Sequence, residues 1–104
     1  MGITKYIRLF TPEDRKRFYL ETEKGRPIRF VVQYETWLRR KWRPVIRYDT
    51  AHGYAHKDVL DRRDRVIQKT ELKNIDYKKA LDIADDDIEA NWKTYKKDFS
   101  KRGK

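Results

Sequence analysis

Residues 28–38 read IRFVVQYETWL and form the clearest strand pattern in the chain. Large apolar or aromatic side chains recur at every second position, which is the period that places them on one face of a β-strand. This run therefore predicts a long strand with one face toward a core. One face carries Ile28, Phe30, Val32, Tyr34, Thr36 and Leu38, and the other carries Arg29, Val31, Gln33, Glu35 and Trp37.

Shorter strand patterns lie on both sides of this run. Residues 16–22 alternate before it, and residues 42–48, 54–60 and 65–70 alternate after it. Because the connections are too short for crossover helices, we expect an antiparallel meander of four or five strands over about residues 16–70.

The segment Thr11–Asp14 precedes the first predicted strand. It combines a Thr suited to cap a helix, a Pro at the next position and two acids. This order is typical of a helix or turn start, so we expect no strand before residue 16.

The C-terminal third changes to a helical period. Asp76 is suited to cap a helix, with Ile75 before it as a staple residue. We expect one amphipathic helix over about residues 76–99, packed on one face of the sheet, and a frayed basic tail at 100–104. The apolar stripe is Tyr77, Leu81, Ala84, Ile88, Trp92, Tyr95 and Phe99, whereas the acids Asp82, Asp85, Asp86 and Glu89 share a face that we interpret as solvated. Residues 1–104 then form a single α+β domain.

The composition restricts the class of protein. The chain has 104 residues, a formal net charge of +10 and no cysteine, which excludes disulfides, zinc ribbons and thiol nucleophiles. Since it has neither a long apolar run nor a secretory signal, we expect a soluble cytoplasmic protein with no membrane contact. Few Asn, Gln and Met residues among many charged ones are typical of a thermophile, although a small basic protein also fits.

The excess positive charge falls on the predicted strands and turns, among Tyr and Trp residues. Such a surface suits phosphates and unstacked bases, so we expect nucleic-acid binding, with RNA slightly favoured. The alternative is a structural or partner-binding module whose charge serves only stability. The predicted nucleic-acid contacts are Arg29, Arg39, Arg40, Lys41, Arg43, Arg47, Arg62, Arg63, Trp37 and Tyr54.

A single helix leaves one face of the sheet uncovered. That face carries Val31, Trp37 and Val45 in the predicted strands. This face is either exposed to solvent or buried against a partner, so we also expect a homodimer.

Both histidines fall in one short segment, residues 47–58, which reads RYDTAHGYAHKD. If residues 54–60 are extended, His56 and Asp58 project from the same face, and His52 in the glycine loop can swing toward them. Two imidazoles and a carboxylate can hold a metal ion. Alternatively, the histidines act as general acid and base in metal-independent RNA cleavage. In a third, structural interpretation they stabilise a tight turn and fill a sheet position.

The candidate catalytic residues are His52, His56, Asp49, Asp58, Arg47 and Lys57. Arg47 or Lys57 would stabilise the charge that develops on a phosphate. No cofactor and no bound metal is predicted, and the sequence leaves open whether the protein is an enzyme.

The histidine segment also resembles segments of known protein families. Preceded by the W-R-P-V strand and followed by N-W-K-T-Y at residues 91–95, it resembles a small prokaryotic domain family of unknown function with an RYDxAHGxxH core. That resemblance implies a strand, the core motif and a C-terminal helix. The segment is more distantly similar to TumE-type toxins, although Thr50 stands where they have Asn and a second His-His cluster is missing. This similarity implies a ribonuclease toxin with an antitoxin partner.

Overall fold

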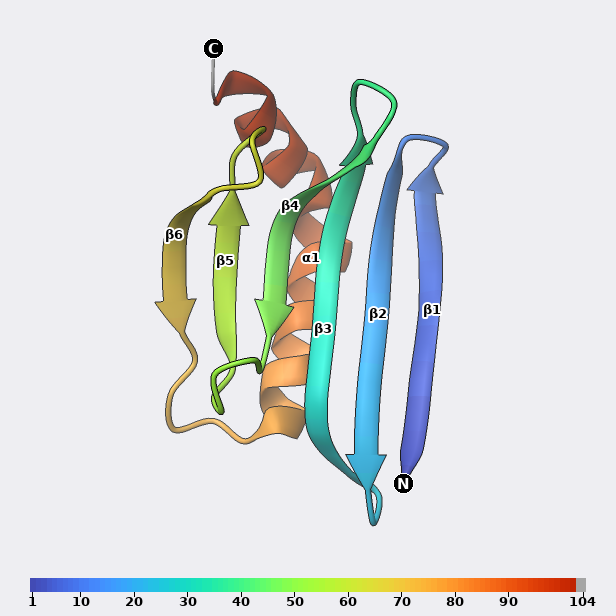
Figure 1. Ribbon diagram of the computed structural model, residues 1–104, viewed down its shortest axis with the longest axis vertical. Helices are drawn as coiled ribbons and strands as arrows, with labels where there is room; N and C mark the ends of the chain where they lie inside the picture. The colour runs from blue at the N-terminus through green and yellow to red at the C-terminus, as the bar shows by residue number, and fades with distance from the viewer. Residues whose placement is uncertain (103–104) are drawn as a thin grey trace.

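The computed structural model describes residues 1–102 and shows an antiparallel sheet with one helix on one side (Figure 1). The six strands follow chain order across the sheet, so each pairs with its neighbour in sequence. The α+β class, the meander and the single C-terminal helix are confirmed. The elements are β1 (Gly2–Thr11), β2 (Asp14–Glu23), β3 (Arg26–Trp37), β4 (Trp42–Asp49), β5 (His56–Leu60), β6 (Val66–Glu71) and α1 (Tyr77–Lys101).

The sheet has six strands, not four or five, because β1 pairs along its length with β2. The Thr11–Asp14 segment closes this hairpin instead of starting a helix. Thr11 Oγ1 accepts a hydrogen bond from the Glu13 amide at 3.0 Å and donates one to Asp14 Oδ2 at 2.7 Å. Side chains that cap helices stabilise a tight turn by the same local bonds. The sheet therefore begins at Gly2 and not near residue 16.

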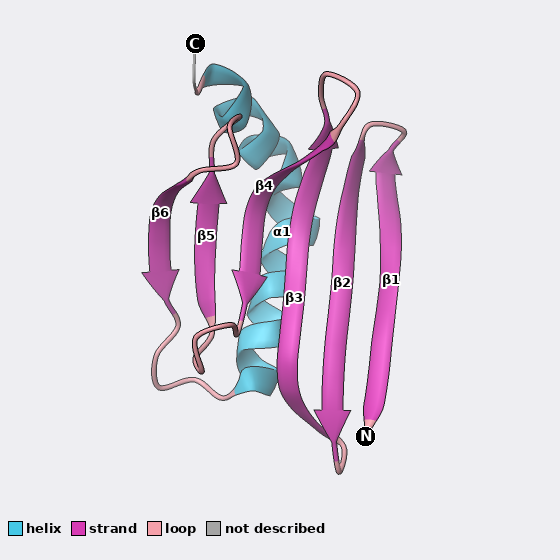
Figure 2. Cartoon of the chain, in the orientation of Figure 1, coloured by secondary structure: helices cyan, strands magenta, loops and turns pink. Residues whose placement is uncertain are grey.

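The apolar stripe of α1 packs on the middle of the sheet (Figure 2). Ala84 and Ile88 are fully buried, as are Phe30 and Val32 on β3. The predicted packing of the helix on this strand face is correct except at Ile28, which is 40% exposed. Because Phe30 already contacts Tyr77, the first residue of α1, Ile28 lies beyond the end of the helix.

The ends of α1 follow from local hydrogen bonds. The Asp76 carboxylate accepts from the Lys79 amide at 2.7 Å, which confirms the predicted cap. The helix continues to Lys101, two residues beyond the predicted end, and the rest of the predicted tail, residues 103 and 104, lies outside the described residues. Within residues 1–102, α1 lacks an apolar stretch that could span a membrane.

The acidic face of α1 is only partly solvated. Asp82 and Asp86 are exposed, as predicted. Asp85 and Glu89 instead accept hydrogen bonds from Lys16 Nζ at 2.6 and 2.7 Å. The prediction of a wholly solvated face is wrong because a lysine of β2 lies under the helix.

The sheet face away from α1, called the open face below, is less apolar than predicted. Val45 was expected there, but a β-bulge opposite Tyr34 and Glu35 inserts it as an extra residue of β4, and it is fully buried in the core. Val31 is half-buried and Trp37 is exposed. Exposed apolar side chains instead lie on the edge strand β1, and they include Ile3, Ile7 and Leu9. The homodimer stays a prediction.

Candidate functional site

The histidine segment builds a compact cluster on the open face. Asp49 ends β4 and His56 begins β5, and the two are cross-strand partners. Asp58 lies two residues beyond His56 and so projects on the same side of the strand. His56 Nε2 is 2.9 Å from Asp49 Oδ1 and 3.6 Å from Asp58 Oδ2. One potential ligand atom from each of the three side chains lies within 4.8 Å of the others.

This cluster is buried and incompletely hydrogen-bonded. The side chains of His56 and Asp58 are only 2% and 6% exposed. His56 Nδ1 and Asp58 Oδ1 are buried without a hydrogen-bond partner. The nearest cation to Asp58 Oδ1 is Lys69 Nζ at 3.9 Å, which is too far for a hydrogen bond. Unpaired buried polar atoms are uncommon in folded proteins and call for an explanation.

The loop between β4 and β5 brings the second histidine over the cluster. The His52 and His56 rings are 5.3 Å apart, and His52 is exposed. Thr50 Oγ1 accepts a hydrogen bond from the Phe30 amide and fixes one end of the loop. Gly53 has φ +83°, a backbone conformation that favours glycine. His52 is therefore near the cluster but accessible to solvent.

The structure separates the two predicted basic partners from each other. Arg47 lies on the open face, where its Nε donates to Gln33 Oε1 at 2.7 Å. Lys57 lies on the helix side, where its Nζ donates to the Tyr95 hydroxyl at 2.8 Å. Because neighbours in a strand point to opposite faces, Lys57 is not part of the cluster.

A second polar network occupies the open face beside this cluster. Glu35 is buried and accepts hydrogen bonds from Arg15 at 2.7 Å and Arg17 at 3.2 Å. Gln33 links it to Arg47 by donating to Glu35 and accepting from Arg47. The sequence did not predict this network, although Gln33 and Glu35 in a long strand pattern were a signal that polar side chains share a face.

An aspartate lies between two tyrosines on the helix side. The Tyr48 and Tyr95 hydroxyls each donate to Asp87 Oδ2 at 2.6 Å. Burial alone would raise the pKa of Asp87, but these bonds hold it below its ordinary value. Burial and the adjacent carboxylate raise the pKa of both tyrosines. The hydroxyls stay protonated at neutral pH and join α1 to β4.

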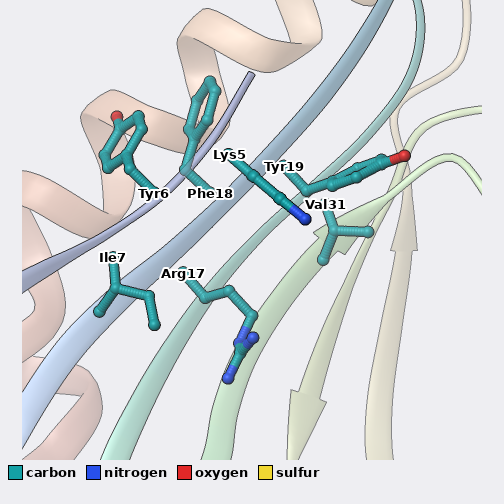
Figure 3. A pocket seen from close by; sticks show the side chains of 7 residues that line it. All are labelled: Lys5, Tyr6, Ile7, Arg17, Phe18, Tyr19 and Val31. Carbon is teal, nitrogen blue, oxygen red and sulfur yellow. The ribbon is translucent and has the colours of Figure 1, made fainter. Parts of the chain in front are cut away.

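A hollow of about 570 Å³ over β1–β3 is a shallow depression and not a substrate cavity. In Figure 3 Tyr6 and Phe18 project on one side of the strands, and Ile7, Arg17 and Val31 project on the other. Tyr6 and Phe18 stack on each other with ring centroids 4.7 Å apart. The hollow therefore belongs to the open face, on which Ile7, Arg17 and Val31 project.

Basic residues gather at one end of the sheet, in the β3–β4 and β5–β6 turns (Figure 1). Lys41 Nζ lies 3.7 Å from Asp64 Oδ2, which shows that the two turns adjoin. Trp37 is 41% exposed beside this end and packs edge-on against Trp42. We call this surface the basic end; it comprises Arg39, Arg40, Lys41, Arg62, Arg63 and Arg65.

Two of the remaining predicted contacts lie elsewhere. Arg29 pairs with Glu21 at 3.4 Å near the opposite end of the sheet, and Tyr54 belongs to the His52 loop. Arg43 adjoins the β3–β4 turn, where it donates to the Leu38 carbonyl oxygen at 3.5 Å. The predicted surface is thus split, and the two turns, Trp37 and Arg43 lie at the same end of the sheet.

Fold and site define a class: a small basic α+β protein whose meander sheet carries a buried His–Asp cluster on its open face. The chain belongs to the family described as Domain of unknown function (DUF7718), whose sequence model matches residues 1–104. Neither the curated proteins nor the solved structures include a significant match to it.

Proposed function

We propose that the protein binds nucleic acid, with RNA favoured, through the basic end. One observation supports this more than any other: the β3–β4 and β5–β6 turns, which carry the six cationic residues of the basic end, adjoin through the contact of Lys41 with Asp64. A cluster of cationic residues suits a phosphate backbone, which is a line of closely spaced negative charges.

Three of these side chains are available for a ligand. Among residues 1–102, Arg39, Arg40 and Arg63 take part in no ion pair within 4 Å and are exposed. Lys41 and Arg65, in contrast, contact Asp64 and Asp61. Unpaired arginines at turn tips can contact phosphates without first breaking an internal bond.

Trp37 supports a preference for unpaired bases. Its ring packs against Trp42 at 5.4 Å between centroids, and the Arg15 guanidinium lies 4.0 Å from the centroid of the Trp42 ring. This support orients an exposed indole at low entropic cost. Indole rings stack on bases that are not paired, which is how single-stranded RNA is commonly bound.

The test is the salt dependence of binding to a short single-stranded RNA. The variant combines Arg39→Asn, Arg40→Asn and Arg63→Gln; Asn suits the positive φ of the first two positions. Since each lost phosphate contact lowers the slope by about 0.7, we expect the log–log slope to fall by about 2.

A matched control removes three charges at the opposite end of the molecule. It combines Lys24→Asn in the β2–β3 turn, Arg26→Gln at the start of β3 and Lys78→Gln at the start of α1. We expect its slope to change by less than half as much. Equal loss in both variants, or no RNA binding by the wild type at low salt, contradicts the proposal.

The ribonuclease toxin is the second candidate. The 5.3 Å between the His52 and His56 rings favours it, but a substrate phosphate can reach His56 only if the loop over it opens. The same RNA samples test it. Cleavage that resists EDTA and is lost in His52→Ala would support an acid–base mechanism, whereas intact RNA contradicts it.

A further inference from the structure

We propose that Asp49, His56 and Asp58 bind a divalent transition-metal ion such as Zn²⁺, with His52 as a fourth ligand. The three side chains come from adjacent strands, β4 and β5, whose cross-strand pairing fixes them. Sites built on paired strands hold ligand positions more precisely than sites on loops. This inference is independent of nucleic-acid binding at the basic end.

The separations between the donor atoms fit a metal ion. Ligands about 2.0–2.2 Å from a metal lie roughly 3.0–3.5 Å from one another in octahedral or tetrahedral geometry. His56 Nε2 lies 2.9 Å from Asp49 Oδ1 and 3.6 Å from Asp58 Oδ2, on either side of that range. The three donor atoms stay within 4.8 Å, so a small rotation about the soft terminal torsion of a carboxylate completes the triangle.

The burial of these side chains supports the same conclusion. Two carboxylates lie near one imidazole nitrogen, and Asp58 Oδ1 is buried without a hydrogen-bond donor. Burying an ionised carboxylate without full pairing is strongly unfavourable. A dication between the three side chains would satisfy this oxygen at ligand distance, whereas Lys69, an ion-pair partner at 3.9 Å from Asp58 Oδ1, is too far for a hydrogen bond.

The ligand set indicates the class of metal. Imidazole nitrogen with carboxylate oxygen favours first-row transition metals, whereas Ca²⁺ and Mg²⁺ prefer oxygen alone. His56 would bind through Nε2 as the neutral imidazole, with its single ring proton on Nδ1.

His52 can complete the set from the loop. It is exposed, its ring lies 5.3 Å from that of His56, and Gly53 follows it at φ +83°. Reorientation of this short segment can bring one of its nitrogens to the metal without moving either strand. The result is a four-ligand site of two imidazoles and two carboxylates.

The experiment is a titration of the full chain, stripped with EDTA and without an affinity tag, with Zn²⁺ by calorimetry and with Co²⁺ by visible absorption. We expect one ion per chain and a Co²⁺ spectrum typical of nitrogen and oxygen ligands. Asp58→Asn should weaken Zn²⁺ binding by at least about tenfold, the lower end of the loss when a metal's surroundings are altered.

Two further variants distinguish the loss of a metal ligand from the loss of the fold and from nonspecific metal binding. His52→Ala replaces an exposed residue, so it leaves the fold intact and should weaken binding by about tenfold. Asp86→Asn on the solvated face of α1 should leave binding unchanged. A folded wild type that binds no Zn²⁺ at micromolar concentration, or Asp58→Asn that binds as tightly as wild type, overturns the site. Full affinity in His52→Ala overturns the fourth ligand.

Discussion

Asp14 has the densest set of hydrogen bonds of any side chain described in residues 1–102. Its oxygens accept from the hydroxyls of Thr11 and Tyr34 at 2.7 Å, from Thr36 at 3.0 Å and from Lys96 Nζ at 2.9 Å. It joins the β1–β2 turn to β3 and α1. Burial alone would raise the pKa of Asp14, but the four donors hold it below its ordinary value of 3.8.

This pKa shift predicts how stability depends on pH. Because the folded pKa is lower than the unfolded one, the contribution of Asp14 is complete above about pH 4 and is lost as the pH falls through the folded pKa. Asp14→Asn should therefore lower the free energy of unfolding by about 1–3 kcal/mol at pH 7. The difference from wild type should shrink below pH 4.

Urea denaturation at several pH values measures this difference. The control is Asp82→Asn, an exposed change that should leave the free energy of unfolding within about 0.5 kcal/mol of wild type. A difference between Asp14→Asn and wild type that stays constant from pH 7 to pH 3 speaks against the assigned role.

The part of the site that lies within a single strand could be predicted from the alternation of side chains along that strand. Alternation placed His56 and Asp58 together, and applied to Lys57 it would also have removed that residue from the cluster. Asp49 joins them through the register of β4 on β5, which the spacing of residues does not determine. The same limit explains why the bonds of Glu35 to Arg15 and Arg17 were missed.

Strand β1 could not be predicted from the periodicity of apolar side chains. Its open side carries Ile3, Ile7 and Leu9, and its helix side carries Tyr6 and Phe10, so the two faces do not separate into apolar and polar. Phe10 stacks on Trp92 with centroids 5.0 Å apart. The strand is stabilised by this distant helix and by its partner β2, which a local pattern does not contain. By contrast, α1 was predictable because its apolar stripe repeats over many turns.

The helix should contribute much of the folding free energy. Ile88 lies on α1 with no exposed surface, in the core with Phe30, Val32 and Tyr34. Ile88→Ala removes buried methyl groups and leaves a cavity, so we expect a loss of about 2–5 kcal/mol. Thermal and urea denaturation measure it.

A matched substitution on the other side of the same helix isolates the packing effect. Asp86→Ala changes an exposed residue and should alter the free energy of unfolding by no more than about 0.5 kcal/mol. If Ile88→Ala is as mild as Asp86→Ala, α1 does not carry the core.

For the whole molecule, the distribution of charge bears on the function hypotheses. The net charge is +10, and three exposed arginines in no ion pair within residues 1–102, Arg39, Arg40 and Arg63, share the basic end. Like charges held together repel and destabilise the folded state, most at low ionic strength. A surface shaped only for stability would pair or disperse them, whereas a surface for a polyanion keeps them together at some loss of stability. Adaptation to high temperature stays a prediction from composition.

The RNA-binding variant therefore makes a second, independent prediction. Without RNA, the combination of Arg39→Asn, Arg40→Asn and Arg63→Gln should raise the free energy of unfolding at low salt by about 1 kcal/mol, because each removed charge relieves a few tenths. For a domain of this size that is a rise of about 4–8 °C in Tm, measured by thermal denaturation. The part of the gain that comes from relieved repulsion should vanish at high salt, where the repulsion is already screened, whereas any gain from Asn at the two positive-φ positions should remain. If the variant is instead less stable at low salt, the cations stabilise the fold, and the structural module becomes the better explanation of the basic end.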